Sequence, residues 1–141
     1  AESPFVMLQA GENADSAAPM TAQLDRDAHH AIWFFTTRGS HFAAEGPASA
    51  TFASRGHDVF ARFSGTLVEE VDRPRLDQHW NSFVASWYPG GRDDPSLLFL
   101  RMDLGEATIW CGKLGLLDSA KMMLGLNVSA AIEGQKATTR L

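Results

Sequence analysis

The stretch Ala-Ile-Trp-Phe-Phe-Thr-Thr at residues 31–37 determines how the rest of the chain is interpreted. Aromatic and β-branched residues of this kind are enriched in strands, and Gly39 follows the run as a breaker. Residues 25–30, which precede it, are mostly polar and typical of a turn. We therefore predict a buried strand over 31–37, with the side chains of residues 33–35 in the core; contact of these side chains with a ligand is the alternative.

Upstream of this strand the chain has the pattern of a hairpin. Phe5–Gln9 and Ala18–Leu24 are short apolar segments, and residues 11–16 between them have the composition of a turn. We expect the two segments to form an antiparallel pair.

Downstream, a short helix is expected to begin at Ser40 and to end at Gly46 and Pro47. Strand character returns over Ala48–Ser54 and, after a tight turn at residues 55–58, over Val59–Glu69. Gly65 interrupts the second of these strands, which predicts a bulge or a sharp bend.

The hydrophobic period changes after Asp72, a candidate N-cap. One helix is predicted, ending at Pro89-Gly90-Gly91, with a single apolar stripe made of Leu76, Trp80, Phe83, Val84 and Trp87. This stripe is interpreted as core or subunit interface in preference to a cofactor site. Two strands, Ser96–Leu104 and Ala107–Gly112, should follow, and one short helix within residues 116–126.

These elements predict a mainly β fold, an antiparallel barrel with a few peripheral helices, and a β-sandwich is the competing geometry. The 141 residues are expected to form one domain, with the barrel over about 5–112 and a C-terminal extension over 113–141.

Composition narrows the classes of function. A formal net charge of −5 disfavours nucleic-acid binding, and no apolar run approaches the roughly 20 residues that a membrane span needs. Residues 1–10 lack the pattern of a secretory signal, so we expect a cytoplasmic protein. Cys111, the single cysteine, is interpreted as an inert buried thiol. The five histidines are not spaced as a ligand set, so no metal site is predicted.

Acidic residues at Asp93 and Asp94, just before Pro95, are a further candidate pair. Paired carboxylates can act as catalysts, but an Asp-rich turn that caps the next element is the favoured interpretation.

Two stretches carry a resemblance to a known family. The first joins Ala18-Pro-Met-Thr-Ala-Gln23 to Ile32-Trp-Phe-Phe-Thr-Thr-Arg-Gly-Ser40. The second lies within Leu76–Pro95 and contains Trp80-Asn81, Trp87-Tyr-Pro-Gly-Gly91 and Asp93-Asp-Pro95. Together with Trp110, they resemble the general stress protein branch of the pyridoxamine 5'-phosphate oxidase-like, FMN-binding split-barrel superfamily.

The resemblance implies a split, Greek-key-like β-barrel that works as a homodimer, with FMN, or FAD as a related flavin, bound at the subunit interface. The flavin ring would lie against the backbone of residues 19–22, and hydroxyls near the end of the 31–37 strand would meet its phosphate. The implied cofactor-binding residues are Pro19, Met20, Thr21, Phe34, Phe35, Thr36, Thr37, Ser40, His41 and Trp110.

Departures from the family pattern affect the expected chemistry. The family's arginine before Pro-Met-Thr is Ala18 here, the oxidases' lysine is Gln23, and Ser40 is followed by His41 where the oxidases carry arginine. Arg38 and His41 are the candidate positive groups that remain nearby. Pyridoxamine-phosphate oxidation is therefore not expected. A flavin-dependent oxidoreductase acting on a small molecule is the leading hypothesis, and a non-catalytic flavin carrier, a sensor or a cofactor-less dimeric barrel is the alternative.

Overall fold

The computed structural model describes residues 5–11, 17–28, 30–39, 45–111, 131–133 and 136–140. The short helices predicted from Ser40 and within 116–126 lie outside these residues. The strands are β1 (Phe5–Ala10), β2 (Ala18–Thr21), β3 (Ala31–Thr37), β4 (Gly46–Ala53), β5 (Val59–Glu69), β6 (Leu97–Cys111), β7 (Ala131–Glu133) and β8 (Lys136–Arg140). The helices are α1 (Arg73–His79), α2 (Ser82–Trp87) and the 3-10 helix η2 (Gly91–Asp93).

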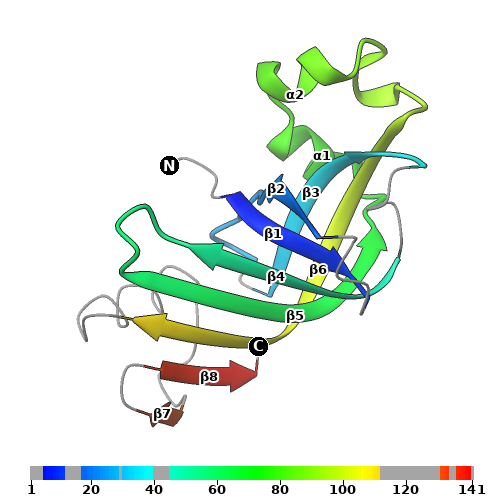
Figure 1. The fold of residues 1–141 in the computed structure, drawn as a ribbon. Coiled ribbons are helices and arrows are strands. Elements are labelled where there is room, and N and C mark those ends of the chain that lie inside the picture. The colour runs from blue at the N-terminus through cyan, green and yellow to red at the C-terminus, as the bar shows by residue number, and fades with distance from the viewer. Residues whose placement is uncertain are drawn as a thin grey trace.

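All strand pairs of the sheet are antiparallel, and the sheet curls into a barrel (Figure 1). The strand order is β2-β1-β4-β5-β6, and the long strand β6 has two partners on its other edge: β3 along its first half and β8 along its second. One bridge, between Gln23 and Trp33, connects β2 to β3 and closes the ring. The predicted mainly β antiparallel barrel with peripheral helices is confirmed, and the predicted pairing of the first two strands is correct.

The barrel interior is filled by alternate residues of each strand, because successive side chains of a strand point to opposite faces. Large side chains with less than 2% exposure anchor this core: Leu8, Phe34, Leu67, Leu100, Met102 and Ile109.

A second apolar cluster lies on the outer face of β3 and β6, under the helices. Trp33 and Phe99 point outward from these strands and pack with Leu76 of α1 and Val84 of α2. The predicted core role of the residue 33–35 run is thus confirmed, with its side chains divided between the two faces of the sheet.

The predicted bulge at Gly65 is present. The register between β5 and β6 shifts between Ser64 and Gly65. A Cβ on Gly65 would lie 2.1 Å from the carbonyl oxygen of Asp103, so only glycine allows the two backbones to approach this closely.

Two element predictions are wrong. The two strands expected around Gly105 are one strand, β6, because its pairing with β5 continues across the bulge. The single late helix is two helices, because the Asn81 side chain accepts a hydrogen bond from the Val84 N–H at 2.9 Å and caps a new helix. The C-terminal hairpin of β7 and β8 was not predicted.

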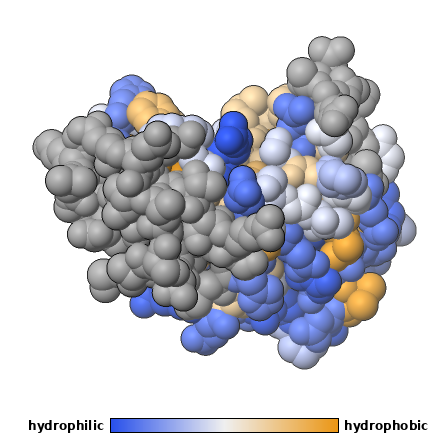
Figure 2. All heavy atoms as spheres, turned by 90° about the horizontal axis from the view of Figure 1, so that it is seen from below, coloured by the Kyte–Doolittle hydropathy of each residue, from blue (hydrophilic) through white to orange (hydrophobic). Residues whose placement is uncertain are grey.

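The helices and the C-terminal hairpin lie at opposite ends of β6 (Figure 1). The face in Figure 2 is largely hydrophilic among the described residues, with apolar atoms in small separate patches. No helix in the described part of the chain is long and apolar enough to cross a membrane.

Candidate functional site

The barrel is least closed between β2 and β3, where Pro19–Thr21 and Phe35–Thr37 flank a place that we call the seam. Next to it, Gln23 and Trp33 exchange two main-chain hydrogen bonds, of 2.8 Å and 3.0 Å. Continued antiparallel pairing from this bridge would place the two flanking segments side by side. Among the described residues the pairing is not continued, so the strands part beyond one rung.

Main-chain groups border the seam on both sides. In an antiparallel strand, the N–H and C=O of every second residue point to the same neighbouring strand. Because those of Gln23 point to β3, those of Thr21 and the carbonyl of Pro19 do so as well. On β3, the main-chain N–H and C=O of Trp33 face β2, and by the same alternation those of Phe35 face β2 as well. Such an edge can hydrogen-bond a planar ligand that has polar atoms on its rim.

The side chains predicted to contact the ring have different environments. Pro19 is exposed, Thr21 is partly buried, and Met20 is partly buried against the barrel core. Phe34 is fully buried inside the barrel, so its side chain has a packing role. Phe35 points outward and stacks on Phe99, with ring centroids 4.7 Å apart.

The residues predicted to meet the phosphate lie at the end of β3. Thr36 is buried, while Thr37 is exposed and its hydroxyl lies 3.5 Å from the hydroxyl of Tyr88. The sequence did not indicate Tyr88 as part of the site, because this contact joins residues that are 51 positions apart. Ser40 and His41 lie outside the described residues.

Within one chain, Trp110 lies far along β6 from the residues at the end of β3. Thr36 pairs with Leu98 of β6, and Trp110 lies twelve residues further along the same strand. At about 3.3 Å per residue, that is about 40 Å along the strand. Trp110 is partly buried and lies next to Arg62, whose guanidinium carbon is 5.5 Å from its ring centroid.

An ion pair joins Arg38, which follows β3, to Glu69 at the end of β5. Two hollows share these residues in their lining: one of about 280 Å³ against the core-facing residues Leu98 and Leu100, and one of about 380 Å³ over the helix-facing side of β6. The sequence indicated Arg38 as a charge near the site but did not indicate Glu69, whose partner is 31 residues away.

Beneath the helices, His79 is buried and stacks on Trp33 at 5.3 Å between ring centroids. Neither Nε2 of His79 nor Nε1 of Trp33 has a hydrogen-bond partner. The guanidinium of Arg75 lies over the Trp33 ring, with its carbon 4.5 Å from the ring centroid, and pairs with Asp25. Burial, followed by the positive charge of Arg75, lowers the pKa of His79 below its ordinary value. This histidine is therefore held neutral at neutral pH.

The turn interpretation of the acidic pair is confirmed for Asp94. Its carboxylate accepts hydrogen bonds from the hydroxyl and N–H of Ser96 and from the N–H of Gly90, at 2.7–3.0 Å. These bonds, led by the Ser96 hydroxyl, lower the pKa of Asp94. The described ranges contain no group of three His, Cys, Asp or Glu side chains that could hold a metal ion.

Comparison with known proteins gives one family and several structural neighbours. Residues 1–137 match the family model described as pyridoxamine 5'-phosphate oxidase like. A general stress family protein from Xanthomonas campestris pv. campestris is 38% identical, with a TM-score of 0.67, and the match covers 94% of this chain and 84% of that one. No curated protein matches the sequence.

Two more solved structures are similar. The general stress FMN/FAD binding protein from Xanthomonas citri is 35% identical, with a TM-score of 0.69 and coverage of 93% of this chain and 87% of that one. General stress protein 26 from Jannaschia sp. CCS1 is 29% identical, with a TM-score of 0.74 and coverage of 99% and 91%.

Proposed function

Because this chain belongs to the pyridoxamine 5'-phosphate oxidase-like family, we propose that it binds a flavin, with FMN as the preferred form, in the seam between β2 and β3. The observation that carries this proposal is the parting of the two strands after the Gln23–Trp33 bridge. It leaves main-chain donors and acceptors directed into the gap of an otherwise continuous barrel.

The chemistry of the residues fits a flavin. Its pyrimidine rim needs donors and acceptors, which the main chain of Thr21 and Phe35 can supply. Its phosphate needs hydroxyls or cations, which Thr37 and Arg38 can supply. The neighbour from Xanthomonas citri, described as FMN/FAD binding, supports the same cofactor class.

The proposed activity is flavin-dependent redox chemistry on an unidentified small molecule. A bound flavin supplies hydride transfer, and the protein supplies orientation, fixed dipoles and shelter from water. Phe35 stacks on Phe99, which packs the β3 side of the seam against β6.

We further propose that two copies of the chain form the complete site. We infer that Trp110 reaches the seam from a second subunit, because it lies twelve residues along β6, about 40 Å of strand, from the residue that pairs with Thr36. Light scattering on the purified protein should give twice the chain mass of 15.4 kDa. A monomeric mass with flavin bound would contradict the shared site but leave flavin binding intact.

A second candidate function is that of a non-catalytic flavin carrier, a sensor or a barrel that has lost its cofactor. Ala18 and Gln23 favour it, because these positions contribute no positive charge beside the seam. Each missing charge-assisted contact weakens binding by about 1.5–3 kcal/mol.

Flavin titration separates these functions. The purified protein should quench the fluorescence of added FMN, and Thr37→Val should weaken FMN binding about tenfold because it removes a hydroxyl donor. Thr51→Val, at an exposed position of β4, is the matched control and should bind like the wild type. Bleaching of the bound flavin by reduced nicotinamide would support an enzyme. A chain that binds neither FMN nor FAD would refute the proposal.

A further inference from the structure

We propose that α1 is a clasp across the closed end of the seam, where Gln23 and Trp33 form the single rung, and that Arg75 is the residue that holds the two sides together. The clasp limits how often the segment after β2 separates from β3. Its effect on a bound flavin rests on the proposed function, whereas the clasp itself is a property of the chain without a ligand.

Arg75 contacts both sides of the seam at once. Its guanidinium pairs with the carboxylate of Asp25, which lies two residues after Gln23. The carbon of the same guanidinium lies 4.5 Å from the centroid of the Trp33 ring on β3. Gln23 and Trp33 are the two residues of the rung. One side chain of α1 thus connects the chain beside one partner of the rung with the side chain of the other.

The contact on the β2 side involves a buried carboxylate at the centre of a turn. Besides its ion pair, the Asp25 carboxylate accepts a hydrogen bond from the Asp27 N–H at 2.9 Å, and the Asp25 carbonyl oxygen accepts one from the Ala28 N–H at 3.2 Å. The side chains of Asp25 and Arg75 are 7% and 25% exposed, so water can replace little of this pairing while the barrel is closed. Movement of Gln23 away from β3 therefore strains or breaks the ion pair.

On the β3 side, α1 contacts Trp33 at two positions one helical turn apart. Arg75 and His79 are four residues apart, so they lie on the same face of the helix. His79 is buried and stacks on the Trp33 ring, and Leu76 belongs to the same apolar cluster. Arg75 thus reaches Asp25 from a helix that is itself packed on β3.

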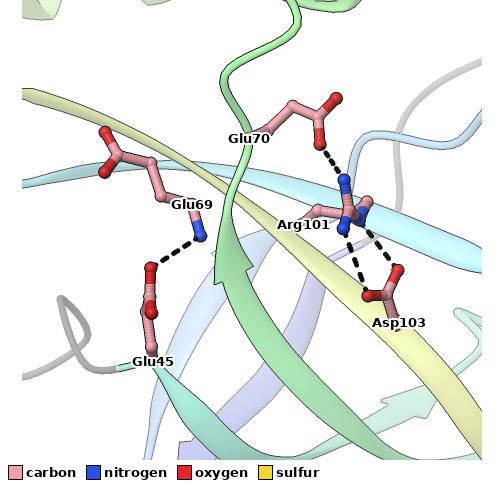
Figure 3. Close-up of polar contacts among 5 residues, drawn as sticks. All are labelled: Glu45, Glu69, Glu70, Arg101 and Asp103. Atoms are coloured by element: carbon pink, nitrogen blue, oxygen red, sulfur yellow. Dashed lines mark hydrogen bonds and ion pairs between the residues drawn. The ribbon is translucent and has the colours of Figure 1, made fainter.

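A second arginine beside Trp33 is engaged elsewhere. Arg101 of β6 is the residue opposite Trp33 in the ladder between β3 and β6. Its guanidinium lies between the carboxylates of Glu70 and Asp103 and pairs with both (Figure 3), the second at 2.8 Å. Arg101 therefore connects the chain after β5 to β6, and of these two arginines it is Arg75 that connects β3 to the segment after β2.

The two contacts of Arg75 indicate how large the effect of the clasp is. A hydrogen bond between charged groups corresponds to about tenfold or more in an equilibrium constant, and a guanidinium over an indole ring to about two- to fivefold. The rung has two main-chain hydrogen bonds and, among the described residues, no second rung between β2 and β3 beside it. Loss of Arg75 should therefore raise the population of the opened seam about tenfold or more.

Hydrogen exchange followed by NMR, on the protein without flavin, tests the clasp. In Arg75→Gln the amide protons of Gln23 and Trp33 should lose about tenfold or more of their protection, because the local opening no longer has to break the contacts of Arg75. Arg75→Lys keeps the charge that faces Asp25 but not the planar group over Trp33, so its loss should be about two- to fivefold.

Two further variants make this measurement specific. Arg75→Gln alone leaves Asp25 as a buried, unpaired charge, so Arg75→Gln with Asp25→Asn, which leaves no unpaired charge, should show the same local loss. Arg73→Gln is the matched control: it removes the same charge two residues earlier in α1, from a side chain that is 52% exposed and pairs with Asp93 at 2.7 Å. The rung should keep its wild-type protection in this control.

Stopped-flow mixing with FMN tests the consequence for a ligand. A clasp that controls the opening of the seam controls entry and exit equally. In Arg75→Gln the association and dissociation rates of FMN should therefore both rise about tenfold, while the dissociation constant stays within about twofold of the wild-type value, since the opened form is a minor population in both proteins.

Each contrary outcome has a definite meaning. Wild-type protection of the rung in Arg75→Gln, or an equal loss of protection in Arg73→Gln, would overturn the clasp. A rung that opens more often while both FMN rates stay unchanged would overturn its control of ligand release. A wild-type protein that binds no flavin would refute the proposed function, and the exchange measurements would still decide whether α1 is a clasp.

Discussion

Replacement of Gly65 by alanine tests the close contact between β5 and β6. The added Cβ would lie 2.1 Å from the Asp103 carbonyl oxygen and 3.2 Å from the Leu104 Cα, and both are backbone atoms that cannot rotate away. The strands must therefore move apart by about 1 Å, since carbon and oxygen need about 3 Å or more. Overpacking combined with a weakened ladder bond should destabilise the fold by about 2–4 kcal/mol, a large part of a typical 5–15 kcal/mol.

Urea unfolding followed by tryptophan fluorescence measures this effect, and Gly105→Ala is its control. A Cβ on Gly105 would lie 3.6 Å from the Ser64 carbonyl oxygen, which is ordinary contact, so that variant should change stability by less than about 1 kcal/mol. A Gly65→Ala variant whose unfolding free energy is within about 0.5 kcal/mol of the wild-type value, the size of ordinary surface effects, would contradict this close contact. So would an equal loss of stability in both variants.

Three further predictions concern the two apolar clusters and α2. Burial, and then the charge of Arg75, lowers the pKa of His79, so the stability that neutral His79 contributes is complete above about pH 6.5 and is lost as the pH falls below that value. In thermal melts from pH 7.5 to 5, the stability of His79→Gln should therefore depend less on pH than that of the wild type. Equal pH dependence in the two proteins would contradict this. Phe34→Ala should lower the unfolding free energy by about 3–5 kcal/mol in urea titrations, because this side chain is fully buried, and a loss below 1 kcal/mol would be inconsistent with the core. The double variant Phe83→Ser with Trp87→Ser should have an unfolding free energy within about 0.5 kcal/mol of the wild-type value in the same assay, because these side chains are 68% and 70% exposed. A larger loss of stability would mean that the two side chains are covered in solution.

Hydrophobic alternation and turn residues predicted the strands whose ends are set by neighbouring residues in the sequence. Val59–Glu69 was predicted with the bounds that β5 has, since alternation and a tight turn specify both its face and its start. Gly65 was recognised as a bulge for the same kind of reason. The continuity of β6 through Gly105 could not be predicted, because it depends on hydrogen bonds to β5, which lies some forty positions earlier.

The split of the late helix shows a different limit. The stripe from Leu76 to Trp87 has helical spacing, but the Asn81 side chain replaces a main-chain bond and starts a second helix. As a result Val84 is buried, whereas Phe83 and Trp87 are exposed, so the stripe does not form one core face.

The residues of the candidate site were proposed from the sequence, but their arrangement could not be. Pro19–Thr21 and Phe35–Thr37 are brought close by the bridge between Gln23 and Trp33, and the sequence contains no pattern for a ladder that stops after one rung. Glu69 was missed for a related reason, since only the closed barrel brings the end of β5 to Arg38.

The single rung between Gln23 and Trp33 also bears on how quickly a bound molecule can leave. β2 is paired with β1 at four positions, yet among the described residues one rung, at Gln23 just after β2, attaches this segment to β3, so the first local opening of the barrel should occur there. Amide protons of these two residues should exchange with solvent sooner than those of β5. A molecule held between β2 and β3 would add hydrogen bonds of its own, so its binding should suppress this local opening.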